Sequence, residues 1–304
     1  MRREEKFIVR FRGVRGSYPV PGEKTVRVGG NTTCLEVQVG GNLIIFDAGT
    51  GIISLGHELV REHRETGQPI LASLFFTHTH HDHTQGFPFF EPAYLESSIL
   101  YVFGPKTFYE DIEGALQRAM LPPFFPVALA DLKSLRIISN LDEGEAVVLN
   151  EGKDPQIYSV YRDKGPKGPE SVTIKVMRSS AHPKGVSIYK VEWAGRSVVF
   201  ATDTEGYIDG DTRLIYFSEG TDLLIHDAQF TEEEYISGPI PKQGWGHSTP
   251  QIAIQVAKKA EVKSLALFHH DPMHDDDFLT ELERQAQAEF PQTMLAREGL
   301  ILEL

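Results

Sequence analysis

Short apolar runs recur along the chain and are separated by turns rich in glycine, proline and aspartate. Apolar runs, continuous or alternating with polar residues, predict strands. We expect strands over residues 7–12, 34–39, 43–46, 70–76, 100–103, 172–177, 186–193, 197–201, 223–225, 262–268 and 299–304, with further short ones between 135 and 160. Apolar residues at helical spacing predict helices over 52–65, 107–120, 251–260 and 278–290. Strands and helices that alternate in this way are typical of an α/β fold.

Polar side chains of one kind follow several of the predicted strands. Asp47 follows one apolar run, and His182, Asp203, Asp227 and His269 stand at or shortly after the ends of others. Open α/β sheets place their ligand sites at the carboxyl ends of the strands. The sequence therefore predicts a shared site at that edge. There, Asp47 would either orient a neighbouring histidine or cap the following helix.

The densest of these segments is residues 76–86, Phe-Thr-His-Thr-His-His-Asp-His-Thr-Gln-Gly, which holds four of the 12 histidines. If the backbone stays extended after the preceding strand, His78 and His80 point to the same side. Asp82 and His83 would come from a tighter turn and face a second point nearby. Imidazole and carboxylate are the ligands expected for zinc and similar divalent metals, so the run predicts two metals side by side. A solvent-exposed His-rich turn is the alternative.

Composition is that of an ordinary globular protein. Of 304 residues, 40% are hydrophobic and 24% are charged. No apolar run approaches the roughly 20 residues of a membrane-spanning helix. The charged N-terminus has no signal-peptide core and Cys34 is the only cysteine, so we expect a cytoplasmic protein without an intrachain disulfide. The formal net charge of −13 argues against an extended nucleic-acid surface, although bound metals reverse the sign of the field locally.

The Gly/Pro-rich loop 13–31 is a candidate for contacts to a ligand. Loops of this length are often functional, and Arg15, Ser17, Arg27 or Asn31 would then face a pocket. The alternative is a long hairpin-like connection with glycine at left-handed positions.

An aromatic segment follows the histidine run and supplies a second set of candidates. Phe87 and Phe89, together with Phe124 and Phe125 further along, have flat rings that suit stacking on a base. Aromatic residues at this density also occur in cores and in homodimer contacts, which is the other interpretation.

Taken together, these segments resemble the five metal motifs of the metallo-β-lactamase superfamily, in order. The segment His78-Thr79-His80-His81-Asp82-His83 matches the signature, and His182, Asp203 and His269 match the third, fourth and fifth positions. The resemblance spans nearly the whole chain. It implies an αββα sandwich, in which two mixed β-sheets are flanked by helices, and we expect residues 1–304 to form a single domain of this fold.

The resemblance also implies a dinuclear metal site. Its implied ligands are His78, His80 and His182 for one metal, Asp82, His83 and His269 for the other, and Asp203 as the bridge. Zinc is the default for this ligand set, and manganese and iron use similar ligands. His269 is preferred to its rival His270 because Leu265-Ala266-Leu267-Phe268-His269 matches the ending of the fifth motif.

Within the superfamily, the closest resemblance is to the phosphodiesterase branch that includes tRNase Z and the cyclic-nucleotide phosphodiesterases. Gly246-His247-Ser248-Thr249 resembles its His-Ser-Thr element, and Asp227-Ala228-Gln229-Phe230 resembles its Glu-Ala-Thr element. In that branch the acid orients the histidine, which donates a proton; Asp227 is one methylene shorter than Glu. tRNase Z also carries a long arm between the third and fourth metal positions, where this chain has room only for a pair of strands between His182 and Asp203.

We therefore expect a metal-dependent phosphodiesterase that acts on a small phosphodiester such as a cyclic nucleotide. A hydroxide that bridges two metals would attack phosphorus, Asp82 would help to steer it, and His247, oriented by Asp227, would protonate the leaving oxygen. The alternatives are a hydrolase of a thioester, lactone or lactam, and an RNA-processing nuclease without the tRNA arm. The complete ligand set disfavours a non-catalytic metal- or nucleotide-binding protein.

Overall fold

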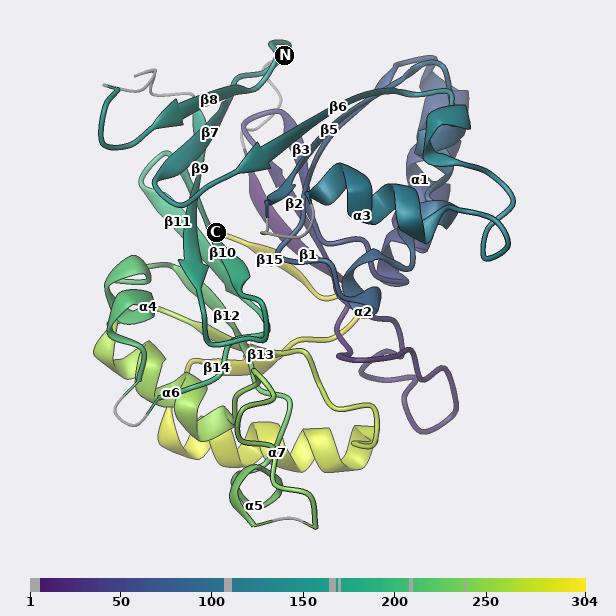
Figure 1. Ribbon diagram of the computed structural model, residues 1–304. Helices are drawn as coiled ribbons and strands as arrows, with labels where there is room; N and C mark the ends of the chain where they lie inside the picture. Colours follow the sequence, from purple (N-terminus) through teal and green to yellow (C-terminus); the bar gives the residue numbers. More distant parts are fainter. Residues whose placement is uncertain (1–5, 107–110, 164–167, 169–170, 208–209, 238) are drawn as a thin grey trace.

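Figure 1 shows a computed structural model of the protein, which describes residues 6–106, 111–163, 168, 171–207, 210–237 and 239–304. Two mixed β-sheets pack face to face, and helices cover the outer face of each sheet. This arrangement is the expected αββα sandwich. It forms because each sheet has two apolar faces, one of which packs against the other sheet and one against helices.

The first sheet comes mainly from the N-terminal half of the chain. Its strands are β1 (Phe7–Gly13), β2 (Cys34–Val39), β3 (Asn42–Phe46), β4 (Ile70–Phe75), β5 (Ser98–Pro105), β6 (Leu135–Leu141) and β15 (Ile301–Glu303). They lie in the order β15-β1-β2-β3-β4-β5-β6. The strands from β3 to β6 are parallel, whereas β1 pairs antiparallel with β2 and β15. The last strand of the chain therefore completes the sheet that the first strands begin.

The second sheet comes from the C-terminal half. Its strands are β7 (Glu145–Leu149), β8 (Gln156–Ser159), β9 (Val172–Ser179), β10 (Val186–Trp193), β11 (Arg196–Ala201), β12 (Leu223–Asp227), β13 (Leu265–Phe268) and β14 (Thr293–Leu295). They lie in the order β14-β13-β12-β11-β10-β9-β7-β8, and the strands from β11 to β14 are parallel. The antiparallel pair β10–β11 fills the interval between His182 and Asp203, as expected.

Helices flank both sheets, and short ones lie in the connecting loops (Figure 1). The first sheet is covered by α1 (Gly51–Thr66) and α3 (Ile112–Ala119), and the second by α4 (Thr212–Phe217), α6 (Pro250–Lys259) and α7 (Asp276–Glu289). The loops hold α2 (His81–Thr84), α5 (Glu232–Ile236) and the 3₁₀ turns η1 (Phe87–Phe89), η2 (Glu91–Tyr94) and η3 (Leu129–Asp131). Within the described part of the chain, none of the helices is long and apolar enough to cross a bilayer.

Aromatic side chains fill the core between the two sheets. The ring of Phe46 on β3 lies 5.6 Å from that of Phe75 on β4 and 5.6 Å from that of Phe200 on β11, measured between centroids. Phe200 in turn packs edge-on against Phe268 on β13 at 5.4 Å. Aromatic pairs at these separations add to the free energy that burial alone provides. That residues 1–304 form a single domain stays a prediction, which this shared core supports.

The observed elements differ from the predicted ones mainly at their ends. The helix predicted over 107–120 is present from Ile112, where Asp111 caps it by accepting a hydrogen bond from Gly114 N at 2.9 Å; residues 107–110 lie outside the described ones. The strand predicted from residue 262 begins at Leu265. The pattern did not predict α2, α4, α5 or β14, because elements this short show no clear period.

A buried ion pair joins the first sheet to α1. The guanidinium of Arg12 on β1 donates to Glu36 on β2 at 2.6 Å and to both carboxylate oxygens of Glu58 on α1 at 2.8 and 2.6 Å. Arg12 and Glu36 are 8% and 2% exposed, whereas the Glu58 side chain is 42% exposed. Removal of a buried partner leaves an uncompensated charge, which costs more than removal of an exposed one.

We expect Glu36→Ala to lower the free energy of unfolding by about 3 kcal/mol, because it leaves the buried guanidinium with one carboxylate fewer. Glu58→Ala is the matched control on the same guanidinium, and it should cost about 1 kcal/mol because water can replace its half-exposed carboxylate. Urea unfolding followed by circular dichroism measures both. Equal costs for the two variants would contradict this account.

Candidate metal centre

The predicted ligands meet at one edge of the sandwich, where strands of both sheets end. The first sheet supplies the histidine run that follows β4, and the second supplies His182 after β9, Asp203 after β11 and His269 after β13. Asp47, Asp203 and His269 have φ angles of 60°, 50° and 64°. This left-handed backbone is unfavourable for residues with a Cβ atom and clusters at functional sites.

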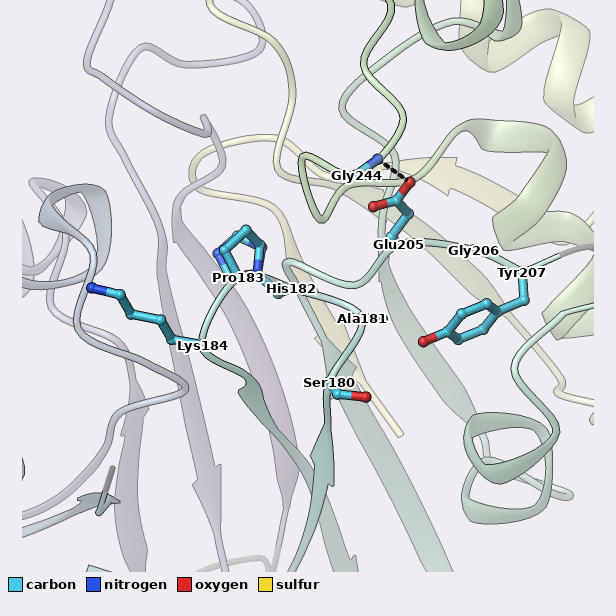
Figure 2. Close-up of a pocket in the computed structure, with 9 residues that line it drawn as sticks. All are labelled: Ser180, Ala181, His182, Pro183, Lys184, Glu205, Gly206, Tyr207 and Gly244. Carbon is cyan, nitrogen blue, oxygen red and sulfur yellow. Dashed lines mark hydrogen bonds between the residues drawn. The ribbon is translucent and has the colours of Figure 1, made fainter. Parts of the chain in front are cut away.

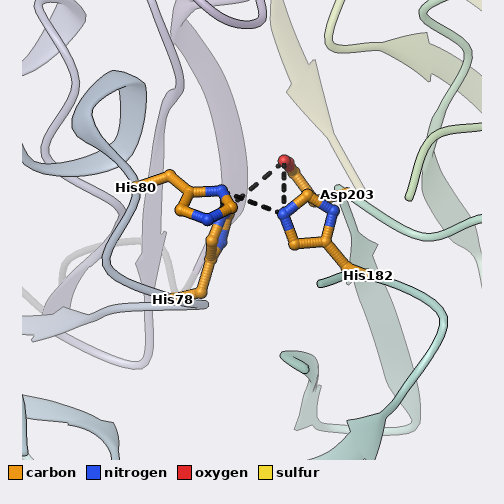
Figure 3. A group of neighbouring side chains, drawn as sticks. All are labelled: His78, His80, His182 and Asp203. Atoms are coloured by element: carbon orange, nitrogen blue, oxygen red, sulfur yellow. Dashed lines mark hydrogen bonds and ion pairs between the residues drawn. The ribbon is translucent and has the colours of Figure 1, made fainter. Parts of the chain in front are cut away.

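Four of these residues form the first group, which we call cluster one (Figure 3). Its members are His78, His80, His182 and Asp203. The Nδ1 atom of His80 lies 3.0 Å from the Nε2 atoms of both His78 and His182. The Oδ2 atom of Asp203 lies 3.6 and 3.8 Å from the same two Nε2 atoms. Tetrahedral zinc ligands, each about 2.0–2.1 Å from the ion, are about 3.3 Å apart, so the spacing fits a divalent cation.

A second group, cluster two, consists of Asp82, His83, Asp203 and His269. The Nε2 atoms of His83 and His269 lie 3.3 and 3.2 Å from Asp82 Oδ2 and both lie 3.2 Å from Asp203 Oδ1. Asp203 thus offers one oxygen to each cluster, the arrangement expected of a bridging carboxylate. Among the described residues, the buried Nε2 of His83 has no hydrogen-bond partner, as expected of a nitrogen whose lone pair serves a cation.

The second ring nitrogen of four histidines contacts an acceptor outside the clusters. These contacts are His78 Nδ1 to Thr77 Oγ1 (3.1 Å), His83 Nδ1 to Asp47 Oδ2 (2.8 Å), His182 Nδ1 to Gly246 O (3.1 Å) and His269 Nδ1 to Gln229 Oε1 (3.1 Å). Where the partner is a carboxylate or carbonyl oxygen, the ring must donate from Nδ1, so Nε2 keeps its lone pair for the cluster.

Asp47 orients a histidine and does not cap the helix that follows. Its carboxylate accepts hydrogen bonds from the N–H and the hydroxyl of Thr77, both at 2.8 Å, as well as from His83. The residue at the N-cap of α1 is Thr50. The sequence left two roles open for Asp47, and the structure favours the one in which it orients a histidine. Thr77 is an additional hydrogen-bond partner of the same carboxylate.

The two clusters differ in electrostatics. In cluster one, burial and the nearby His182 lower the pKa of His80 to about 4, which favours the neutral ring that ligates metal. In cluster two, burial opposes the charged ring of His269, but Asp203 and Asp227 outweigh it and raise the pKa to about 10. Burial alone would raise the pKa of Asp82, but His83 and His269 hold it below its usual range. A bound cation would take the place of the protons that these groups share.

His247 and Asp227 form a pair beside the clusters. Asp227 Oδ2 accepts from His247 Nδ1 at 2.8 Å, so the shorter aspartate still reaches the ring. The backbone N–H groups of Ser248, Gln229 and Asp203 donate to the same carboxylate at 2.8, 3.1 and 3.1 Å. These donors and the two histidines outweigh burial and hold the pKa of Asp227 below its usual range. The His247 ring stacks on His269 at 5.0 Å, and its Nε2 is the nitrogen left to act on a substrate.

Two glycines allow the backbone to approach the histidines closely. Gly246, at φ 88°, accepts from His182 through its carbonyl, and a Cβ atom there would lie 2.2 Å from His182 Nδ1. A Cβ atom on Gly16 would lie 2.5 Å from the ring of His269. Any larger residue at these positions would displace a predicted ligand.

Of the four polar candidates in loop 13–31, one contacts the site and the other three contact other parts of the protein. Ser17 lies at the site, because its N–H donates to Asp82 Oδ2 at 2.7 Å. Arg15 is fully buried and donates to backbone carbonyls, and the Asn31 amide donates to Glu298. Arg27 pairs with Asp277 at the surface. A substrate contact from Ser17 or Asn31 stays a prediction.

The aromatic candidates are also divided. Phe87 is 1% exposed and packs in the core against Phe76, so neither face of its ring is open to a ligand, which speaks against the predicted contact. Phe89 is 54% exposed and meets Phe125 edge-on at 5.5 Å, and Phe124 is 86% exposed. A substrate contact from Phe89 stays a prediction.

His269 and His270 occupy different environments. His269 points into cluster two, whereas His270 Nε2 contacts the carbonyl of Ala296 at 2.9 Å, away from the clusters. Burial lowers the pKa of His270 to about 3, so its ring is neutral. The geometry therefore favours His269 as the ligand.

Two functional neighbours were missed from the sequence. Gln229 contacts His269 and donates to the Ser17 hydroxyl at 3.1 Å. Its place in the segment Asp227-Ala228-Gln229-Phe230 is the signal from which this role could have been predicted. Glu205 lines a cavity of about 430 Å³ beside cluster one, together with His182, Lys184, Tyr207 and Gly244 (Figure 2). The cavity adjoins cluster one through His182.

Comparison with known proteins places this site in a family. The β-lactamase superfamily domain matches residues 42–270, which include the histidine run and every strand end that contributes a ligand. The chain belongs to the β-lactamase superfamily. It is a metal-dependent hydrolase of that superfamily, with His/Asp clusters able to hold metal ions.

Curated relatives and solved structures agree with this membership. A protein named ribonuclease Z from Thermococcus sibiricus is 25% identical over 281 residues, or 86% of this chain and 87% of its own length. Another protein named ribonuclease Z, from Myxococcus xanthus, is 28% identical over 300 residues, which are 90% of this chain and 92% of its own length. The metallo-β-lactamase fold protein YhfI from Bacillus subtilis superposes with a TM-score of 0.67 at 18% identity, over 99% and 100% of the two chains. The short form of human tRNase Z superposes with a TM-score of 0.62 at 18% sequence identity, and the match covers 97% of this chain and 98% of the human one.

Proposed function

We propose that the protein is a metal-dependent phosphodiesterase that cleaves RNA. The observation that carries this proposal is the 2.8 Å contact between His247 and Asp227, directly beside two ligand clusters that share Asp203. A histidine held through Nδ1 presents Nε2 as a proton donor. Cleavage of a phosphodiester needs such a donor, because an unprotonated alkoxide is a poor leaving group.

The clusters would hold divalent cations, and zinc suits their nitrogen and oxygen donors best, with manganese and iron as alternatives. Cluster one would hold one cation, cluster two a second, and Asp203 would contact both. When bound, the metal lowers the pKa of water towards neutrality and offsets the negative charge on the phosphoryl oxygens.

The chain's own residues then have separate tasks. Asp82, fixed by the N–H of Ser17 at 2.7 Å, would accept a hydrogen bond from the attacking water and orient it. His247 Nε2 would give its proton to the leaving oxygen, and Asp227 would stabilise the charged ring before transfer. Because Asp227 accepts three backbone N–H bonds as well, it stays in place while the proton moves.

RNA is favoured over a cyclic nucleotide by the relatives named ribonuclease Z, which align with most of this chain. The β10–β11 hairpin leaves no room for a long arm between His182 and Asp203. We therefore propose a short or single-stranded RNA substrate that is bound near the metal centre. A small phosphodiester such as a cyclic nucleotide is the second candidate, and the same hairpin and the net charge of −13 support it.

A substrate panel tests the proposal. The metal-loaded protein is assayed on a single-stranded oligoribonucleotide, cyclic mononucleotides, bis(p-nitrophenyl) phosphate and a thioester, with Asp82→Ala as the inactive reference. We expect cleavage of the oligoribonucleotide and the synthetic diester, with little turnover of the thioester. Faster turnover of cyclic mononucleotides would select the second candidate. Hydrolysis of the thioester alone, or no diester hydrolysis above the Asp82→Ala level, would overturn the proposal.

A further inference from the structure

An exposed tryptophan stands two residues before His247 and has no part in the site described above. Trp245 is 48% exposed, whereas Trp193, the other tryptophan of the chain, is 8% exposed in the core. Large apolar side chains are usually buried, and an exposed one beside a catalytic histidine is a candidate for binding.

The loop that carries Trp245 is held in place by Glu205. The carboxylate of Glu205 accepts from the N–H groups of Gly244 at 2.6 Å and Gly246 at 3.0 Å, and from the hydroxyl of Tyr235 at 2.5 Å. Figure 2 shows Glu205 bonded to Gly244 at the wall of the cavity beside His182. The exposure of Trp245 is therefore built into an ordered turn, so little entropy is lost when a ligand binds it.

A buried ring connects Trp245 to the proton donor. Phe230 is 2% exposed and meets Trp245 edge-on at 6.4 Å and His247 edge-on at 5.8 Å. Only one aromatic ring thus separates the indole from the imidazole.

A lysine adds a positive charge to the same place. Lys242 Nζ lies 3.9 Å from the centroid of the Trp245 ring and 5.4 Å from that of Phe230. Its ammonium contacts these two rings, and no ion pair with a carboxylate is found for it in the described part of the chain, although the protein carries a net charge of −13. The ammonium covers one face of the indole, so a base would stack on the other face. The exposed indole and this positive charge together match a nucleotide, which offers a flat base and a phosphate.

We propose that Trp245 and Lys242 form the subsite for the nucleoside that carries the leaving oxygen. Its base stacks on Trp245 and the adjoining phosphate contacts Lys242, while His247 protonates the leaving oxygen. The inference rests on the proposed function and adds the part of the substrate that the metal clusters do not bind. It assigns single-stranded nucleic acid as the ligand, because a paired base has no face free to stack.

A binding measurement tests the subsite independently of turnover. The indole fluorescence of the full-length protein is titrated with a single-stranded oligoribonucleotide, and Trp245→Phe is titrated in parallel. We expect quenching in the unmodified protein and little change in Trp245→Phe, because Trp193 is buried. Trp245→Ala should weaken binding about tenfold, within the range for loss of one base–aromatic stack, whereas Trp245→Phe should retain most of the affinity. If the protein cleaves the oligoribonucleotide but its fluorescence is not quenched, the subsite at Trp245 is ruled out and the proposed function stands.

A kinetic comparison locates the base. Dinucleotides that lack the base on one side or the other are assayed with the unmodified protein and with Trp245→Ala, and the products identify the leaving oxygen. We expect Trp245→Ala to raise KM about tenfold except when the leaving nucleoside is abasic. Tyr216→Ala, which removes another exposed ring, on α4, should leave KM unchanged. Equal effects of Trp245→Ala on all dinucleotides would overturn the inference, whereas absence of any diester cleavage by the unmodified protein would instead overturn the proposed function.

Discussion

Asp203→Ala is expected to release metal from both clusters and to slow hydrolysis by at least about 10³-fold, because a metal contributes several kcal/mol to the transition state. No other residue belongs to both clusters with one oxygen directed at each. Removal of any other ligand leaves one cluster complete. The effect of Asp203→Ala on metal content should therefore exceed that of His78→Ala or Asp82→Ala.

Elemental analysis after dialysis measures the metal, and an assay of the same samples measures hydrolysis. Asp222→Ala is the matched control, since Asp222 is also a buried aspartate but pairs with Lys263 far from the clusters. It should keep both metal and activity. Thermal denaturation with and without a chelator completes the test, because bound metal stabilises only the folded state. Full metal content in Asp203→Ala would contradict the bridging role.

His247→Ala is expected to lower kcat by about 10²–10⁴-fold on an unactivated phosphodiester while metal content stays unchanged. His247 belongs to neither cluster, although it also meets Asp203, Asp227 and His269 in a third group of possible ligands. Its Nδ1 is bonded to Asp227 and its ring stacks on His269, so it completes neither of the two clusters. Its loss removes a proton donor and leaves the ligands in place.

The leaving group distinguishes a proton donor from a binding residue. A p-nitrophenolate leaves without protonation, so His247→Ala should lose far less activity on bis(p-nitrophenyl) phosphate than on a dinucleotide. Asp227→Asn should show the same dependence on the leaving group, with a smaller loss. His57→Ala, which removes an exposed histidine from α1, is the control and should match the unmodified protein on both substrates. Equal losses on the two esters would argue against proton donation.

Most of the fold was predictable because its strands are buried on both faces. Runs such as 70–76 and 197–201 are apolar except for Ser73 and Ser197, and they correspond to the largely buried strands β4 and β11. Short elements such as α4 and β14 were missed, since a few residues do not establish a period. The pairing of β15 with β1 also has no local signal, because it joins the two ends of the chain.

The candidate metal ligands could be predicted from the sequence, whereas the residues around them could be predicted only in part. The residue types after the strands predicted the candidate ligands, and the resemblance assigned them to two metals; in the structure they lie close enough together to hold metal ions. The loop and aromatic candidates were harder to sort. Phe87 and Phe89 are two residues apart, yet one is 1% and the other 54% exposed. Both belong to a 3₁₀ turn, where neither strand nor helix periodicity predicts which face is buried.

By itself, the sequence determined which side chains can bind metal and which strands carry them, because ligand chemistry and apolar periodicity are local properties. The resemblance already implied that Asp203 is shared and that His269 is the ligand, and the geometry favours both, whereas only the tertiary structure decided the orienting role of Asp47. The tertiary structure also placed Trp245 and Lys242 beside His247. Each of these depends on which atoms from distant segments lie within a few ångströms of one another, and that distance is set by how the two sheets pack.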